Sequence, residues 1–223
     1  MALAAIALVL VALPAAAEEA VPLDPCVEAA ATAVQRRYET VRDLRADFVQ
    51  RSQAVALGPG GAGQSEASGR VVIAKPGKMR WIYEKPEPSL VVSDGTTLWI
   101  YDPAFREAQK LPVTGEYLSG ATVQFLLGAG RMQRDFRVTA VSCSERQAVL
   151  ELIPREDATY ERLRIRTNPA SGDIEQTTIV DLLGNVTEVE FSNLEVNQDP
   201  DPGLFEFEPG ADVRVIELAP EQP

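Results

Sequence analysis

Apolar and polar residues alternate most densely between Lys75 and Tyr101. This stretch holds both tryptophans and two of the five tyrosines. The pair Asp94-Gly95 separates two apolar runs and is typical of a tight hairpin turn, because such turns need positive φ. Two prolines, at positions 86 and 88, mark the preceding turn, since proline cannot donate to a strand ladder. The pattern therefore predicts three consecutive antiparallel strands.

The predicted register pairs Val91 with Leu98 and brings Tyr83 near Val91. Because side chains alternate with a period of two, one face of the sheet gathers six side chains: Met79, Trp81, Tyr83, Val91, Leu98 and Ile100. The other face is apolar too, with Ile82, Leu90, Val92, Trp99 and Tyr101. A sheet with one wet side should carry polar residues there. We infer that something covers each face, or that one face lines an apolar cavity.

Two segments have helical signals. Asp24 followed by Pro25 is typical of a helix start, and apolar residues then recur at three-four spacing as far as Leu44. A second, short helix is predicted over residues 118–128, which include Phe125 and Leu126 and end in glycine. Because this helix carries few charges, it should be buried or lie over something apolar.

The rest of the chain reads as strands joined by turns. They are expected at residues 48–50, 69–74, 106–111, 136–142, 148–153, 163–167, 174–182, 186–194, 205–208 and 213–216. Counting the central stretch, we expect about ten or eleven of these segments to be strands of one sheet, and so long an antiparallel sheet must curl toward a barrel. We predict a mainly β (α+β) fold: an incomplete antiparallel β-barrel whose N-terminal and short internal helices form a lid over the concave side.

The length and net charge of the chain limit its possible domain organisation and partners. The chain has 223 residues, enough for one sizeable domain, and a formal net charge of −12. Such acidity argues against a nucleic-acid partner and against binding to an anionic membrane surface. Residues 1–17 resemble a signal peptide, with an apolar core and small residues before Glu18, although the usual basic start is missing. We expect an exported single domain over residues 18–223.

Cys26 and Cys143 are the only cysteines. In an oxidising compartment the economical interpretation is one disulfide, worth about 4–5 kcal/mol in the chain-entropy model because it closes a long loop. The alternative is two unpaired buried thiols.

Few side chains in the sequence suggest a catalytic site. The chain has no histidine, which excludes Ser-His-Asp and Cys-His mechanisms and any site that needs imidazole. The acidic pairs at 156–157 and 199–201 lie in turn-like segments, where solvated loop charges are the simpler interpretation. No metal, nucleotide or flavin motif is evident. The sequence therefore predicts neither an enzyme nor a cofactor.

The central stretch resembles the LolA family of periplasmic lipoprotein carriers. Its most specific parts are residues 75–83, Pro86, residues 91–95, residues 98–103 and Gln109, supported by residues 48–50, 126–128 and 205–209. Their order and spacing are similar to those of the family from about Cys26 to Ile216.

This resemblance implies a half-barrel with a helical lid and an apolar cavity, and it assigns Met79, Trp81 and Val91 to the cavity wall. With them we expect five further residues to line the cavity, namely Tyr83, Leu98, Ile100, Phe125 and Leu126, and we expect Lys75 to act as the lid latch. It also implies a monomeric periplasmic protein whose partners are acylated lipoproteins, an inner-membrane Lol ABC transporter complex and the outer-membrane receptor LolB or an equivalent. Family members hold the lid shut with an arginine at the position of Lys75. Lysine offers a point charge instead of a planar fork, so a bidentate clasp is not available.

Three functions fit these observations. The first is a periplasmic chaperone that shelters lipoprotein acyl chains between the two membranes. The second is a sensor built on the same half-barrel, which binds a lipid or a lipoprotein to control a signalling protein. The third is a carrier of another lipid, such as a glycolipid.

Overall fold

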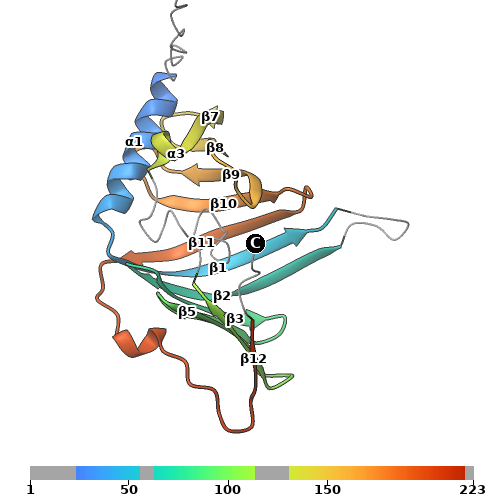
Figure 1. The fold of residues 1–223 in the computed structure, drawn as a ribbon. Helices are drawn as coiled ribbons and strands as arrows, with labels where there is room; N and C mark the ends of the chain where they lie inside the picture. Colours follow the sequence, from blue (N-terminus) through green and yellow to red (C-terminus); the bar gives the residue numbers. More distant parts are fainter. Residues whose placement is uncertain (1–23, 56–62, 114–130, 219–223) are drawn as a thin grey trace, which may run out of the picture.

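One curved, open sheet organises the described part of the chain, which comprises residues 24–55, 63–113 and 131–218 of this computed structural model (Figure 1). Within these ranges, twelve strands follow the order β12-β6-β5-β4-β3-β2-β1-β11-β10-β9-β8-β7. The β12–β6 pair is parallel, and the other neighbouring pairs are antiparallel. The strands at the two ends, β12 and β7, do not pair with each other, so the sheet is not closed. The predicted incomplete, mainly antiparallel barrel is confirmed.

The elements follow the chain in a simple order. The strands are β1 (Asp43–Gln53), β2 (Gln64–Ala74), β3 (Lys78–Lys85), β4 (Ser89–Asp94), β5 (Thr97–Asp102), β6 (Glu107–Pro112), β7 (Phe136–Cys143), β8 (Ala148–Pro154), β9 (Tyr160–Thr167), β10 (Ile174–Asp181), β11 (Val186–Val196) and β12 (Arg214–Glu217). The helices are α1 (Pro25–Thr40), the short α3 (Met132–Asp135) and the 3-10 helix η1 (Pro202–Phe205). The predicted signal peptide and the predicted helix at 118–128 lie outside the described residues.

Helix α1 begins where the sequence predicts. The Asp24 side chain accepts a hydrogen bond from the backbone N–H of Cys26 at 2.9 Å, and Pro25 occupies the first turn. The helix ends at Thr40, earlier than the apolar stripe suggests. Val41 and Leu44, the last positions of that stripe, are buried beyond the end of the helix.

The register of the two central hairpins differs from the prediction by two residues. Val91 pairs with Ile100 instead of Leu98, and Trp81 pairs with Val91 instead of Tyr83. One cause is Asp94, whose Oδ1 accepts hydrogen bonds from the backbone N–H groups of Thr96 and Thr97 at 2.7 and 2.8 Å. This carboxylate shapes a longer connection than the predicted two-residue turn.

The predicted faces survive this error, because a slip of two residues leaves every side chain on its side of the sheet. The six predicted neighbours still share one face, and so do the five on the opposite side.

The face that α1 covers, called the inner face here, carries the main core. Apolar residues of α1 are buried with others from both halves of the sheet in one cluster. Its helix members include Val27, Ala30, Val34 and Tyr38. In Figure 1, α1 crosses the sheet beside β7 to β10. Burial on one stripe of α1 therefore joins the helix to the sheet.

The opposite, outer face of β3 to β5 is covered by the segment that follows β11. Phe207 packs against Trp99 and Tyr101, with ring centroids 5.5 and 5.2 Å apart. Phe205 is only 2% exposed, and the Arg80 guanidinium donates to the carbonyl oxygen of Leu204 at 2.8 Å. The C-terminal segment therefore covers the outer face only in part, since Trp99 and Tyr101 stay half-buried. The inner face, which carries the main core, is the candidate cavity wall.

The prediction of a strand over residues 205–208 is wrong. Asp201 caps the preceding turn by accepting a hydrogen bond from the N–H of Gly203 at 2.9 Å, and Pro202 begins η1. This local capping bends the chain so that Phe205 points at the sheet instead of pairing along it. The apolar alternation at residues 205 and 207 therefore indicates that the segment packs against a sheet, and not that it forms a strand of it.

We expect Phe205→Ala to destabilise the protein by about 3–4 kcal/mol, because it empties a buried site between the C-terminal segment and β3. Urea unfolding followed by tryptophan fluorescence measures this loss. Phe105→Ala is the matched control, since Phe105 is 77% exposed and its removal should change stability by less than about 0.5 kcal/mol. Equal effects of the two substitutions would contradict the packing described here.

Candidate functional site

Four aromatic rings from three strands form the centre of the inner face. Phe48 of β1 meets Trp81 and Tyr83 of β3 edge to face, with centroids 4.8 and 5.1 Å apart. Phe191 of β11 lies 6.4 Å from Trp81. Edge-to-face contacts of this kind add about 0.5–1.5 kcal/mol per pair to the area they bury. The rings therefore form a stiff apolar floor.

Gly69 makes this arrangement possible. It lies in β2 between Phe48 and Tyr83, with which it is paired on either side. A Cβ atom at this position would come within 1.8 Å of the Ile82 carbonyl oxygen. The missing side chain lets β2 and β3 approach closely and leaves room for the Phe48 and Tyr83 rings to meet above the strand between them.

The predicted lining residues form a gradient across the inner face. Met79, Trp81 and Leu98 are buried, at 5%, 8% and 4% exposure. Tyr83 and Val91 are half-buried, and Ile100 is 36% exposed. The apolar surface thus runs from the core to solvent along β3, β4 and β5. Phe125 and Leu126, the other two predicted members, lie outside the described residues.

One polar group interrupts the open part of this surface. The Tyr83 hydroxyl donates to the Gln50 side-chain oxygen at 3.1 Å, and burial raises the pKa of Tyr83. Because the hydroxyl is already paired, the ring can stay against an apolar ligand without an unsatisfied donor.

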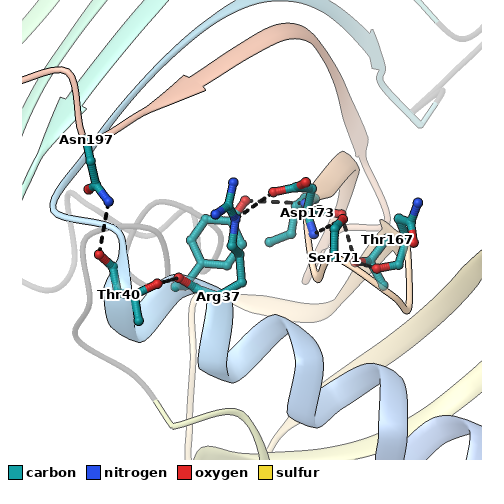
Figure 2. A network of polar contacts seen from close by, with 9 residues as sticks. Arg37, Thr40, Thr167, Ser171, Asp173 and Asn197 are labelled. Atoms are coloured by element: carbon teal, nitrogen blue, oxygen red, sulfur yellow. Dashed lines mark hydrogen bonds and ion pairs between the residues drawn. The ribbon is translucent and has the colours of Figure 1, made fainter.

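Helix α1 is fastened to the sheet along its length. Figure 2 shows contacts near its C-terminal end, where the Arg37 guanidinium meets the Asp173 carboxylate at 2.7 Å. The Tyr38 hydroxyl accepts from the backbone N–H of Ile174 at 3.3 Å. Gly172 in the same turn packs so closely that a Cβ would lie 2.3 Å from the carbonyl oxygen of Ala33. The β9–β10 turn is therefore shaped to receive this helix.

Both ends of α1 are held as well. A disulfide joins Cys26 in the first turn to Cys143 at the end of β7, with Cα atoms 6.1 Å apart. At the other end, the Lys75 ammonium donates to the backbone carbonyl of Tyr38, and the Asn197 side chain donates to the carbonyl of Thr40 at 3.3 Å (Figure 2). Lys75 thus contacts α1, the helix that the resemblance treats as part of the lid.

The environment of Lys75 is partly apolar. Burial lowers the pKa of its ammonium group, and the nearby charge of Glu39 opposes that effect. A single rotatable donor satisfies one carbonyl here, whereas an arginine fork could reach two.

Sequence reasoning missed several residues of this site. Phe191 is the only aromatic residue in its strand, and its alternation could have assigned it to the inner face. The contact between Arg37 and Asp173 spans 136 residues, and nothing local in the sequence signals it. Tyr38 was identified as an apolar helix position, but its buried hydroxyl contact was not.

The described ranges hold neither a metal-binding cluster nor a helix able to span a membrane. No cluster of three or more Cys, Asp or Glu side chains there could hold a metal ion. No helix of those ranges is long and apolar enough to cross a membrane. What the geometry offers is an apolar surface.

The fold and this surface define a half-barrel protein with an apolar inner face crossed by a helix. Comparison with known proteins places it more closely. The family model for "Outer membrane lipoprotein carrier protein LolA" matches residues 39–208. The chain belongs to this LolA family of carrier proteins.

Individual relatives agree with the family match. An outer-membrane lipoprotein carrier protein of Dechloromonas aromatica (strain RCB) is 31% identical over 188 residues, covering 82% of this chain and 88% of the relative. One of the same description from Nitrosospira multiformis is 32% identical over 185 residues, covering 80% and 84%. An uncharacterized conserved protein from Thermus thermophilus has a similar fold, with a TM-score of 0.51, 13% identity and coverage of 86% and 98%.

We expect Lys75→Met to weaken the attachment of α1, because the Tyr38 carbonyl loses its charged donor while the aliphatic stem is kept. The cost should be about 1 kcal/mol, since Lys75 is half-buried. Hydrogen exchange of the last turn of α1 should become faster. Lys75→Arg is the control and should restore protection, and unchanged exchange in Lys75→Met would contradict the contact.

Alkaline pH should destabilise the protein through Tyr38. Burial raises the pKa of this hydroxyl from 10.0 to about 12, so the native state holds its proton over a range in which the unfolded state loses it. Stability should therefore fall as pH rises from 10 toward 12, by on the order of 2–3 kcal/mol from this group.

Urea midpoints of the native protein and of Tyr38→Phe, measured between pH 8 and 11.5, check this expectation. The variant should be less stable at pH 8, because the N–H of Ile174 loses its acceptor, yet it should lose less stability at high pH. Parallel pH curves for the two proteins would show that Tyr38 does not titrate as described.

Proposed function

We propose that this protein is a periplasmic chaperone that carries lipoproteins by sheltering their acyl chains against the inner face of its sheet. The observation that carries the proposal is the continuous apolar path from Trp81 to Ile100. Family membership supports it independently, because the similar relatives are lipoprotein carrier proteins by description.

The energetics fit a carrier. Each acyl CH₂ removed from water contributes about 0.8 kcal/mol, so a long chain contributes on the order of 10 kcal/mol. A lipoprotein therefore leaves a bilayer very slowly unless another apolar surface replaces the lipid. A carrier needs no catalytic residue for this exchange, but it needs an outside source of work for loading.

The partners follow from this requirement. Loading would come from the inner-membrane Lol ABC transporter complex, and unloading would occur at the outer-membrane receptor LolB or an equivalent. The mature protein would begin near Glu18 and act as a monomer. Lys75 would hold α1 in place over the loaded or empty surface. Its single hydrogen bond is easier to break than a bidentate clasp, which suits a latch that must open.

The test is a solubility assay with purified components. A triacylated lipoprotein in detergent is mixed with the mature protein, and the detergent is then diluted below its micelle concentration. We expect a soluble one-to-one complex, measured by size-exclusion chromatography with light scattering. A lipoprotein that precipitates equally with and without the protein would overturn the proposal.

A matched pair of variants locates the binding surface. Ile100→Glu places a charge at the open end of the inner face, and Val215→Glu places one at a similarly exposed position on β12, where Val215 pairs with Ala108 on the outer side. The first should weaken complex formation at least about tenfold, because an acyl chain would have to desolvate a carboxylate. The second should leave it unchanged. Equal effects would place the acyl chains elsewhere.

Native mass spectrometry of the protein purified from the periplasm identifies its natural ligand. A glycolipid or another free lipid in place of an acylated protein would favour the third function considered from the sequence. A signalling protein recovered in stoichiometric complex would favour the sensor.

A further inference from the structure

The turn between β10 and β11 displays two leucines to solvent. Leu182 and Leu183 are 67% and 69% exposed, more than any other large aliphatic residue in the described ranges. They are consecutive, and they lie at the tip of the hairpin that extends away from α1 in Figure 1. Single exposed apolar residues are ordinary, but an adjacent pair on a projecting tip forms a contiguous apolar patch.

The turn holds these leucines in a fixed conformation. One oxygen of Asp181 accepts hydrogen bonds from the backbone N–H groups of Leu183 and Asn185, both at 2.8 Å. Its other oxygen accepts from the Asn185 side chain at 2.7 Å, and Gly184 adopts a positive φ of 86°. Donation from Asn185 lowers the pKa of Asp181, so the carboxylate that organises the turn stays charged. A rigid turn loses little entropy when a partner binds it.

A third apolar side chain extends the patch. The backbone N–H of Val55, which follows the end of β1, donates to the Asn185 side-chain oxygen at 2.9 Å. Val55 is 46% exposed, and its Cγ2 would lie 3.3 Å from a Cβ built on Gly184. Leu182, Leu183 and Val55 therefore form one projecting surface, called the leucine tip here, which hydrogen bonds link across two hairpins.

An acidic groove adjoins the leucine tip. It has a volume of about 400 Å³ and is lined by residues 51–53, 64–66, Val186 and Glu188. The carboxylates of Glu66 and Glu188 both approach Arg51, at 3.0 and 3.6 Å. One guanidinium cannot neutralise both, and Asp181 adds a further negative charge beside the tip. The leucine tip and the acidic groove together form a surface with one apolar part and one negatively charged part.

This combination favours a protein partner over a lipid surface. The net charge of −12 and the carboxylates beside the tip would repel an anionic bilayer. A second copy of the chain would bring the same negative charges together. An apolar pocket with an arginine or lysine on its rim matches both parts, since a basic side chain could enter the groove while the leucines fill the pocket.

We propose that the leucine tip and the adjoining acidic groove form the docking surface for a membrane-anchored partner protein that presents an apolar pocket with a basic rim. This inference rests on the proposed carrier function, in which the protein must recognise a transporter and a receptor. The surface lies apart from the inner face, so docking and acyl sheltering use different residues.

Binding to the detergent-solubilised inner-membrane lipoprotein transporter of the same bacterium tests the inference. The transporter is immobilised, and the full mature protein is passed over it by biolayer interferometry at several salt concentrations. We expect Leu182→Ser/Leu183→Ser to weaken binding at least about tenfold. Glu66→Gln should weaken it less and should flatten its salt dependence. Leu182→Met/Leu183→Met should bind like the native protein.

The controls separate this inference from the carrier function. Val141→Ser removes an exposed apolar side chain, 57% exposed, from edge strand β7 and should not affect binding. The serine pair should still keep a lipoprotein soluble when the lipoprotein is supplied from detergent, so loss of sheltering in the native protein would count against the carrier function alone. Equal transporter binding by the native protein and the serine pair would overturn the docking surface.

Two further measurements address other occupants. Flotation with phosphatidylcholine vesicles tests lipid binding, and sedimentation velocity tests self-association. Vesicle binding or dimerisation that disappears in Leu182→Ser/Leu183→Ser would overturn the assignment to a protein partner. Absence of both in the native protein would support it.

Discussion

Strands β3 to β5 are apolar on both faces, and each face has to be removed from water. Most antiparallel sheets avoid this demand by keeping one face polar. On the outer side the C-terminal segment of the chain supplies part of the cover: Phe207 packs against Trp99 and Tyr101, and Phe205 is buried. The inner face is covered fully at Met79 and Leu98 but only partly at Val91 and Ile100. Partial cover leaves apolar side-chain surface in contact with water, and the proposed carrier function would use this surface for acyl chains.

The attachment of α1 sets how this surface could change. Its first turn is joined covalently to β7 by the Cys26–Cys143 disulfide, whereas Arg37, Tyr38 and Thr40 in its last turns are held by hydrogen bonds and an ion pair. A movement that keeps the disulfide must leave the first turn in place and break contacts at the other end. Lys75 lies at that breakable end, with a partly buried ammonium whose pKa is lowered by burial. The strength of this attachment is therefore a local property of the C-terminal end of the helix.

Local signals predicted much of the architecture. The Asp24-Pro25 cap, the alternation of β3 to β5 and the turns of the second half each depend on neighbours in sequence, and they located α1 and most strands correctly. The predicted faces of the sheet were correct although the hairpin register was wrong. A shift in pairing by an even number of residues leaves every side chain on the same side of the sheet. In the hairpin of β4 and β5 the error came from Asp94, whose side-chain hydrogen bonds shape the turn in a way that the Asp-Gly pair alone does not specify.

Features that depend on distant parts of the chain could not be derived in the same way. The cover of the outer face by Phe207, the fit of Gly172 against Ala33 and the ion pair between Arg37 and Asp173 all join segments more than a hundred residues apart. The apolar alternation at Phe205 and Phe207 even suggested the wrong element, since contact with a sheet and membership of a sheet favour similar side chains. A similar ambiguity applies to the inner face. Alternation alone says that a face is apolar, and only the fold gives the exposure of each side chain, which rises from 8% at Trp81 to 36% at Ile100.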